Sequence, residues 1–410
     1  MAKEYKDLVV GLDIGTAKVM AVVAEVLSGG ELKLAGLGVA ASNGLKRGVV
    51  VNIDATVQSI QQALKEAELM ADCKITRVYT GITGSHIRGI NSSGMVAVKD
   101  KEVTPADVAR VVETARAINI STDQRLLLVE PQEFVIDGQD VKEPIGMSGI
   151  RLEAKVHIVT GAVASAQNII KCCNRSGLNV AEMVLAPLAA AEAVLTDEER
   201  ELGVVLIDVG GGTTDIAVYH DGTVKHTAVI PIGGNHVTND IAAGLRTPFN
   251  DAERLKQRHG FARASMVTED ERVELPCVAG KGAGTVSRQI LCEIIEPRLD
   301  EIFEMVQKEV AKSGFEGALA SGVVATGGSM LLTGAVEMAE RSFGLPVRLG
   351  APTRVGGLTD IINTPSYAAA VGLALHGMKR QERGMAFRSR DDKILSKVKH
   401  RMSDWLSEFF

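Results

Sequence analysis

Residues 204–219 read VVLIDVGGGTTDIAVY, so that an aliphatic run ends at three consecutive glycines and a second aliphatic run follows. Aliphatic β-branched residues favour buried strands, whereas each glycine inside an element lowers its stability by roughly 0.5–1 kcal/mol. A ligand that approaches the backbone closely would explain three such glycines, and a glycine-rich bulge is the alternative. The stretch predicts two strands joined by a turn whose N–H groups can bind phosphate.

Two other stretches have a similar design. Residues 10–19, VGLDIGTAKV, place Asp13 before a Gly-Thr turn and Lys18 after it, which adds a hydroxyl donor and a positive charge to a phosphate-sized turn. Residues 323–331, VVATGGSML, end an aliphatic run at paired glycines before a predicted helix, and such a helix N-terminus admits a flat or anionic ligand closely. The three stretches in this order are far more specific than any one of them alone.

The order of predicted elements repeats along the chain. Each of two units has three strands followed by a helix, and Asp13 and Asp208 occupy equivalent places in the two units. An internal repeat of this kind suggests two similar domains related by a pseudo-two-fold axis, with a cleft between them. The predicted elements are strands at 8–14, 18–26 and 31–40 with a helix at 54–70 capped by Asp54, strands at 204–209, 215–219 and 223–232 with a helix at 235–245, and further helices at 105–119, 251–259 and 287–312.

The bulk numbers fit a globular protein. Apolar residues make up 46 % of the 410-residue chain and charged residues 23 %, while aromatic residues are scarce at 3 %. Val, Ile, Leu and Ala must therefore form the core, as in a sheet covered on both faces. No signal peptide and no apolar run of about 18 residues is evident, and the five cysteines and eight histidines show no disulfide framework or metal-binding spacing. The net charge of −6 argues against nucleic acid as a partner.

The three quoted stretches resemble the phosphate-one, phosphate-two and adenosine motifs of the superfamily that contains actin, sugar kinases and heat-shock chaperones. Residues 185–195, LAPLAAAEAVL, and 365–375, PSYAAAVGLAL, resemble its two connecting helices, whose Ala and Gly surfaces let two helices pack closely as a hinge. The resemblance implies an α/β fold of the actin-like, two-domain ATPase type, with a nucleotide cleft between the domains.

A further set of stretches resembles the subdomain peculiar to the FtsA family of bacterial cell-division proteins. GITGSHIR at 81–88, NSSGM at 91–95 and PIGMSGIRLEAKVH at 144–157 carry this resemblance, which covers nearly the whole chain. It divides the chain into a first actin-like domain (1–80, 161–195 and 363–376), an inserted FtsA-type subdomain (81–160), a second actin-like domain (196–245 and 318–362) with its own insertion (246–317), a linker (377–392) and a C-terminal amphipathic helix (393–410).

The resemblance also implies roles for individual residues. Asp13 and Asp208 would hold a hydrated Mg²⁺ that bridges the phosphates, and Asp208 and Glu192 would act in hydrolysis, with Glu192 orienting a water molecule. Glu253 and Lys256 would hold the ribose and the adenine edge, although an exposed i,i+3 ion pair is the alternative. The implied ATP-binding residues are Gly15, Thr16, Ala17, Lys18, Gly210, Gly211, Gly212, Thr213, Gly234, Asn235, Glu253, Lys256, Gly327, Gly328, Ser329 and Met330.

The last residues, 377–410, carry a net charge of +4, so the rest of the chain carries −10. On a helix with about 100° per residue, Lys397 and Arg401 lie on a polar face opposite an apolar arc of about 160°. Such a helix either docks onto the body of its own protein or lies in a membrane interface. The polar stretch before it favours the membrane, because a docked helix needs no tether. The apolar arc consists of Ile394, Leu395, Val398, Met402, Trp405, Leu406, Phe409 and Phe410.

Members of the FtsA family bind ATP, self-associate into actin-like filaments and recruit the tubulin-like FtsZ to the cytoplasmic face of the inner membrane at the division site. By resemblance, the FtsZ C-terminal tail would dock on residues 246–317, with Arg288 and Lys281 as contacts for an acidic peptide. Later division proteins would bind residues 81–160, anionic lipids would bind the C-terminal helix, and ATPase activity would be weak or regulatory. Two other functions are compatible with the fold: a kinase or rapid ATPase, and a pilus-type actin-like adaptor, which would lack the inserted subdomain and the tail.

Overall fold

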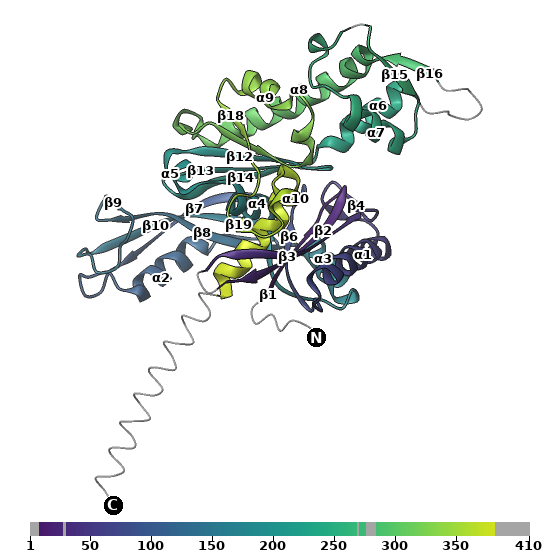
Figure 1. Ribbon diagram of the computed structural model, residues 1–410. Helices are drawn as coiled ribbons and strands as arrows, with labels where there is room; N and C mark the ends of the chain where they lie inside the picture. The colour runs from purple at the N-terminus through teal and green to yellow at the C-terminus, as the bar shows by residue number, and fades with distance from the viewer. Residues whose placement is uncertain (1–7, 28–29, 269, 276–283, 382–410) are drawn as a thin grey trace, which may run out of the picture.

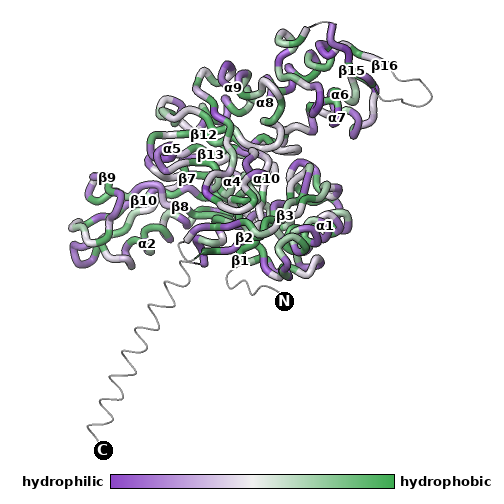
Figure 2. Tube along the Cα trace, viewed as in Figure 1, coloured by the Kyte–Doolittle hydropathy of each residue, from purple (hydrophilic) through white to green (hydrophobic). Residues whose placement is uncertain are grey.

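Two β-sheets form two lobes of the protein (Figure 1). The computed structural model describes residues 8–27, 30–268, 270–275 and 284–381. Lys281, the predicted C-terminal helix and most of the predicted linker therefore lie outside the described residues. Apolar residues concentrate along the strands of both sheets, whereas many surface loops are polar (Figure 2).

Lobe 1 contains a six-stranded sheet in the order β11-β6-β1-β2-β3-β19. Its first two strands coincide with the predicted ones, but α1 begins at Ile53 with Asn52 as its N-cap, so the prediction of Asp54 as the cap was wrong. The Asn52 side chain accepts a hydrogen bond from Ala55 N at 3.0 Å, and Asp54 lies in the first turn, where a carboxylate suits the helix dipole. The elements are β1 (Leu8–Ile14), β2 (Lys18–Val26), β3 (Leu32–Ala41), β4 (Leu45–Lys46), β5 (Val49–Val50), α1 (Ile53–Ala71), β6 (Arg77–Ile82), α3 (Val163–Arg175), β11 (Asn179–Leu185), α4 (Ala186–Val194) and β19 (Val355–Gly356).

Lobe 2 contains a five-stranded sheet in the order β14-β13-β12-β17-β18. Its first three strands form an antiparallel meander and β17 runs parallel to β12, just as β1–β3 form a meander and β6 runs parallel to β1. The predicted internal repeat is confirmed. The elements are α5 (Asp197–Leu202), β12 (Val204–Val209), β13 (Thr214–His220), β14 (Thr223–Ile230), α6 (Gly234–Leu245), α7 (Phe249–His259), β15 (Arg272–Leu275), β16 (Gly284–Ser287), α8 (Arg288–Ser313), β17 (Val323–Thr326), α9 (Ala335–Phe343), β18 (Val347–Leu349) and α10 (Thr359–Ile362).

Residues 84–160, here called the insert, form a small sheet of their own in the order β7-β10-β8-β9, with one helix. Thr104 caps that helix through a capping box with Asp107, and Pro105 occupies the first helical position, as the sequence predicts. The insert branches from lobe 1 but lies beside β14 of lobe 2 (Figure 1). Its elements are β7 (Arg88–Ala97), α2 (Pro105–Arg116), β8 (Gln124–Ile136), β9 (Gln139–Val141) and β10 (Arg151–Ala162).

Two helices rich in small residues, α4 and the helix at 368–381, join the lobes in one continuous apolar cluster. They touch backbone to backbone, because a Cβ atom on Gly372 would lie only 1.7 Å from the Ala189 carbonyl oxygen. The predicted close packing of two connecting helices is thereby confirmed. The second helix extends through residue 381, so the prediction of a linker from residue 377 was wrong at its start. Gly377 stays helical because it packs on the Tyr79 ring, which would meet a Cβ there at 2.5 Å.

The contact between these helices gives a test of the hinge. We expect Gly372→Ala to lower the free energy of unfolding by about 1–3 kcal/mol, because the added methyl group forces the helices apart. Gly317→Ala is a matched control, since a Cβ atom at Gly317 meets nothing within 4 Å. Thermal unfolding of both variants measures the difference, and equal stability of the two would contradict the close packing.

Candidate functional site

A cavity of about 540 Å³ lies between the lobes. Its volume is in the range of small-molecule sites. Its walls include two turns that face each other, the start of α6, three residues of α7 and the turn after β17. The predicted binding residues that line it are Gly15, Thr16, Ala17, Lys18, Gly210, Gly211, Gly212, Thr213, Gly234, Asn235, Glu253, Lys256, Gly327, Gly328 and Ser329, together with Asp13 and Asp208.

The two glycine-containing turns touch each other across the cleft. A Cβ atom on Gly212 would lie 2.6 Å from Thr16 Oγ1, and one on Gly211 would lie 2.7 Å from the Ala17 Cβ. The glycines are therefore required by the opposite lobe as well as by any ligand, a reason that the sequence does not reveal. The Thr16 hydroxyl also accepts a hydrogen bond from Gly48 N at 2.9 Å, which ties the β4–β5 hairpin to this turn.

Three carboxylates lie together in the cavity wall, with Asp215 buried and Asp13 and Asp208 half-buried. Burial raises the pKa of Asp13 to about 6, and burial together with Asp215 and Asp13 raises the pKa of Asp208 to about 8. Burial likewise raises the pKa of Asp215 to about 7, although two hydroxyl donors act against this. Burial lowers the pKa of Lys18, while the neighbouring carboxylates Asp13 and Asp208 oppose that shift. The charged forms of these carboxylates thus lack sufficient compensation from the protein alone.

Oxygen donors of this kind fit Mg²⁺, which prefers carboxylates, phosphates and water. Within the part of the chain that the structure describes, no three His, Cys, Asp or Glu residues are placed to hold a metal ion together. An ion between Asp13 and Asp208 would therefore take its remaining ligands from phosphate and water, as a hydrated Mg²⁺ does.

The cavity wall also carries a charged pair from α7, Glu253 and Lys256. Lys256 Nζ lies 2.7 Å from Glu253 Oε2, and it also donates hydrogen bonds to Gly234 O at 3.0 Å and Thr238 Oγ1 at 2.8 Å. The Lys256 side chain is only 12 % exposed. The alternative of an exposed ion pair is therefore wrong, because the pair is anchored within the cavity wall. Both charges can meet the hydroxyl and ring-nitrogen groups of a nucleoside.

Sequence reasoning missed Thr83 and Asp215, which line the same cavity. Thr83 follows β6 of lobe 1, and its hydroxyl donates to one oxygen of Asp215, on β13 of lobe 2. The Thr213 hydroxyl donates to the other oxygen at 3.0 Å. The sequence does contain one indication of this contact. Asp215 stands at the start of an otherwise aliphatic strand, where a charged group needs a partner.

Two predicted residues lie elsewhere. Glu192 forms ion pairs with Arg200, at 3.7 Å, and with Lys379, and it is absent from the cavity wall. It follows Ala186, the residue of α4 that does line the cavity, by six positions, or about 240° around the helix. Its assignment as a water-orienting residue is therefore corrected. Met330 is also corrected, since its side chain is buried in the core of lobe 2.

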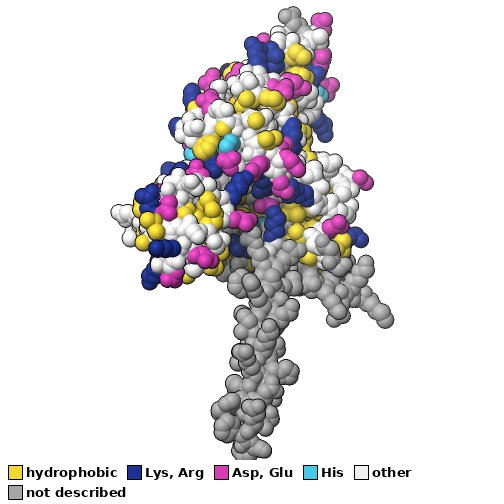
Figure 3. Space-filling model, turned by 90° about the vertical axis from the view of Figure 1, so that its left-hand side faces the viewer, with side chains coloured by type: hydrophobic (Ala, Val, Ile, Leu, Met, Phe, Trp, Pro, Cys, Tyr) yellow, Lys and Arg dark blue, Asp and Glu magenta, His cyan; other side chains and the backbone are white. Residues whose placement is uncertain are grey.

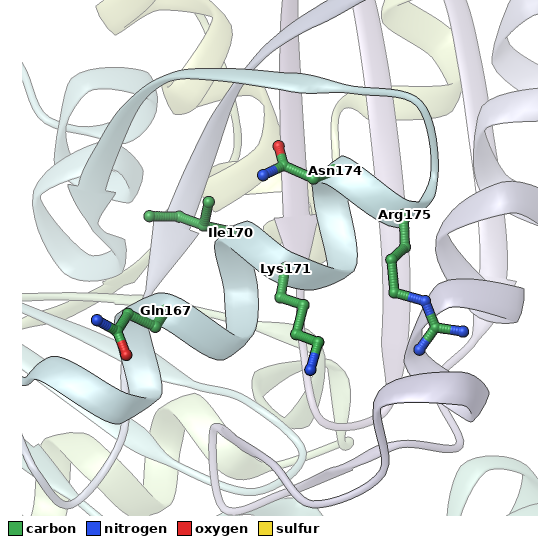
Figure 4. A pocket seen from close by; sticks show the side chains of 5 residues that line it. All are labelled: Gln167, Ile170, Lys171, Asn174 and Arg175. Atoms are coloured by element: carbon green, nitrogen blue, oxygen red, sulfur yellow. The ribbon is translucent and has the colours of Figure 1, made fainter.

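Charged side chains of both signs gather between the lobes on the face that Figure 3 shows. Another hollow, of about 420 Å³, lies on α3 (Figure 4). A single helix supplies all five of its lining residues, and one of them, Arg175, is paired with Asp54 at 2.6 Å. No second element encloses the hollow, so we interpret it as an irregularity of the surface and not as a ligand site.

The predicted peptide contact Arg288 is engaged within lobe 2. Its Nη1 atom lies 2.6 Å from Glu271 Oε2, and its Nε atom donates to His259 O at 2.8 Å. An acidic peptide would have to compete with Glu271 for this guanidinium.

Among the described residues, no helix combines the length and the hydropathy that crossing a bilayer requires.

The two similar lobes and the cavity between them define the class, which is the actin-like ATPase fold. Solved structures with this fold include the PilM-PilN type IV pilus biogenesis complex, with a TM-score of 0.65 and 17 % identity over 90 % of this chain and 98 % of that one. MreB5 of Spiroplasma citri bound to ADP has a TM-score of 0.53 and 15 % identity over 93 % of this chain and 98 % of its own. At these identities the likeness concerns the fold alone.

The family follows from closer relatives. The model of the cell division protein FtsA matches residues 205–372, and that of the SHS2 domain inserted in FtsA matches residues 84–160. The chain is 52 % identical to the cell division protein FtsA of Pseudomonas aeruginosa over 92 % of this chain and 91 % of the relative. It is 44 % identical to that of Escherichia coli K12 over 99 % of both. The chain belongs to the FtsA family of cell division proteins.

The carboxylates of the cavity wall predict a pH dependence of stability. A pKa of about 8 for Asp208 in the folded protein, against an ordinary value of 3.8, means that the folded state binds the proton more tightly. Without a ligand, this contribution to stability is complete below the ordinary value and is lost as the pH rises through about 8. The asparagine in Asp208→Asn does not titrate. We therefore expect the melting temperature of this variant, relative to that of the parent protein, to increase as the pH rises. Asp100→Asn, in an exposed loop, is the control, and a pH-independent difference would contradict the assignment.

Proposed function

We propose that the protein binds ATP with Mg²⁺ between its lobes and acts as a membrane-attached adaptor that anchors FtsZ filaments during cell division. The observation that carries the nucleotide part is one cavity between the lobes whose wall contains both a phosphate-sized pair of glycine turns and the Glu253–Lys256 pair. Membership of the FtsA family supports the part that concerns division.

Each group in the cavity has a place in this proposal. The N–H groups of the two turns and the Lys18 ammonium bind the phosphates, while Asp13 and Asp208 hold the hydrated ion. Such an ion would supply positive charge both to the phosphates and to the carboxylates of Asp13 and Asp208. Glu253 and Lys256 bind the ribose and the adenine edge, and the turn at 327–329 accommodates the adenosine.

Slow turnover fits the same geometry. The residue that α4 presents to the cavity is Ala186, whose methyl group can neither orient water nor accept a proton. Positioning of the attacking water is a major part of hydrolysis, so ATP acts here chiefly by holding the lobes together. A kinase or rapid ATPase would need further polar groups around an acceptor.

Lys256 provides a test of nucleotide binding. We expect Lys256→Ala to weaken ATP binding by about tenfold or more, since a hydrogen bond to a charged group contributes about 1.5–3 kcal/mol. Lys308→Ala is the control, because this lysine lies on the surface of α8 with its side chain 73 % exposed. Calorimetric titration with Mg·ATP measures both. Unchanged affinity in Lys256→Ala would remove the nucleoside end of the proposed site.

Self-association and membrane attachment support one another in this proposal. Each Lys or Arg near an anionic surface contributes roughly 1 kcal/mol, so a single amphipathic helix at 393–410 binds reversibly. A filament of many copies multiplies this attachment without new contacts. The anchor places the protein on the cytoplasmic face of the inner membrane at the division site.

Two surfaces are available for protein partners. The region 246–317 includes α7 and α8 and would take the FtsZ C-terminal tail, with Arg288 and Lys281 as its cationic contacts. The insert carries three exposed apolar side chains within one loop, Ile145, Met147 and Ile150, at 56 %, 41 % and 64 % exposure. Exposed apolar groups of this kind suit a protein interface, and we assign later division proteins to the insert.

The anchor is tested by truncation. We expect the full chain with ATP to sediment with vesicles of anionic lipid, and a chain that ends at Arg390 to stay in solution, because the truncated chain lacks the apolar arc. Vesicles of neutral lipid are the control for the charge contribution. Equal sedimentation of the two chains would contradict the anchor and favour docking of the tail on the protein itself.

A further inference from the structure

The insert contacts lobe 2, although both of its chain connections lead to lobe 1. It leaves lobe 1 after β6 and returns to lobe 1 through β10 and α3. Its sheet nevertheless lies against β14, the edge strand of the lobe 2 sheet (Figure 1). An edge strand leaves backbone groups without a strand partner, and the insert supplies side chains to some of them.

Two amide side chains make these contacts. Gln132 Nε2 donates to the carbonyl oxygens of Val224 at 2.8 Å and Lys225 at 3.1 Å. Asn91 Nδ2 donates to the Lys225 carbonyl oxygen at 3.1 Å. The insert thus holds the backbone of β14 from two of its own strands, β7 and β8.

A buried histidine completes the contact. His157 lies 2.6 Å through Nδ1 from Asn91 Oδ1 and 2.8 Å through Nε2 from Thr227 Oγ1. Burial lowers the pKa of His157 to about 4, so the ring is neutral, and its two nitrogens donate to the amide and accept from the hydroxyl. The surfaces touch directly, because a Cβ atom on Gly89 would lie 2.7 Å from the Thr227 carbonyl oxygen.

The root of the insert makes one more link, at the cavity itself. Thr83, the residue before the insert, donates its hydroxyl to Asp215 of lobe 2. Both residues line the cavity. Thr83 is adjacent in the chain to the first residue of the insert, so the insert contacts lobe 2 along β14 and begins one residue from a hydrogen bond to lobe 2 in the cavity wall.

These links differ in kind from the hinge. The hinge is an apolar cluster formed by α4 and the helix at 368–381, and its separation would expose apolar surface to water. The hydrogen bonds between the insert and lobe 2 go to backbone and hydroxyl groups, and water can replace them when the surfaces part, while Val229 of β14 also packs in an apolar cluster with Leu127 and Leu128 of the insert. The insert can therefore part from β14 without separating the two hinge helices.

We propose that the insert is a clasp across the two lobes, and that its hold on β14 sets the rate at which nucleotide leaves the cavity. The clasp rests on the proposed binding of nucleotide between the lobes, since a ligand enclosed there leaves only when the lobes separate. A partner that draws the insert away from β14 would accelerate nucleotide release. Where it also weakens nucleotide affinity, linkage requires that bound nucleotide weaken the affinity for that partner by the same factor.

Gln132 is the residue of choice for the test, because it holds β14 and does not line the cavity. The full-length protein is loaded with a fluorescent ATP analogue and chased with excess ATP. We expect Gln132→Ala to raise the dissociation rate about threefold to tenfold, as for the loss of one or two net hydrogen bonds. Gln132→Glu should raise it further, because a carboxylate would face two carbonyl oxygens. Gln139→Ala and Gln139→Glu, exposed on β9 of the same insert, are matched controls that leave the rate unchanged.

Hydrogen exchange supplies a second measurement. Nucleotide should slow amide exchange in β14 and β7 of the parent protein and should do so less in Gln132→Ala, while the melting temperatures of the nucleotide-free proteins stay within a few degrees. Parent-like dissociation rates in both Gln132 variants would overturn the clasp while leaving nucleotide binding intact. A parent protein that binds no nucleotide would overturn the proposed function and the clasp with it. Equal acceleration by the Gln139 variants would show a general effect of the insert's surface and also overturn the clasp.

Discussion

The backbone contact between Gly372 and Ala189 is the constraint on which the rest of the structure depends. Any side chain at that point would widen the space between α4 and the helix at 368–381. Gly11, on β1, meets the second helix in the same way, with the Ala370 carbonyl oxygen 2.3 Å from the place of a Cβ. The spacing of the lobes is thus set by small residues one helical turn from Ala186 and Ala369, which line the cavity, and the turns at Gly211 and Ala17 meet at that spacing.

Bringing the turns together has an electrostatic cost. The closed arrangement places Asp13, Asp208 and Asp215 beside one another, with Lys18 as the cation among them, and the pKa of each carboxyl group is raised. In the proposed complex, a divalent ion between Asp13 and Asp208 would offset this cost, because the ion itself is positive where the protein has too little positive charge. The lobes and such a ligand would then stabilise each other, so occupancy of the cavity would influence how the lobes sit.

The sequence predicts the parts of this molecule that depend on local chemistry. The strands β1, β2 and β12 begin and end where glycine turns bound aliphatic runs, and Thr104 and Pro105 fix the start of α2. The sequence does not reveal which way a side chain points from its helix, or which residues far apart in the chain come into contact. Glu192 belongs to a recognisable helix, but its direction depends on how α4 packs.

The end of the second hinge helix was misjudged for a related reason. Residues 377–392 are predicted as a linker, but the helix continues through residue 381, and Gly377 packs on the Tyr79 ring, a contact that no local pattern shows. The hydrogen bonds of Gln132 to β14 join residues more than ninety positions apart in the chain, so no local sequence pattern predicts them.

Glu192 contacts the end of the helix at 368–381, so the two places where the structure differs from the sequence-based prediction lie together. Lys379, on the last described turn, pairs with Glu192 of α4, which also lies 3.7 Å from Arg200 of lobe 2. Arg380 pairs with Glu182 of β11 at 2.9 Å. The segment from which the chain continues toward its C-terminus is thus held by the same helix that joins the lobes. A change in the angle between the lobes must alter the contact between Glu192 and Arg200, because α4 cannot move against lobe 2 without moving Glu192 relative to Arg200. Lys379 shares Glu192 with Arg200, so the hinge geometry and the last described turn of the helix at 368–381 are coupled through one carboxylate.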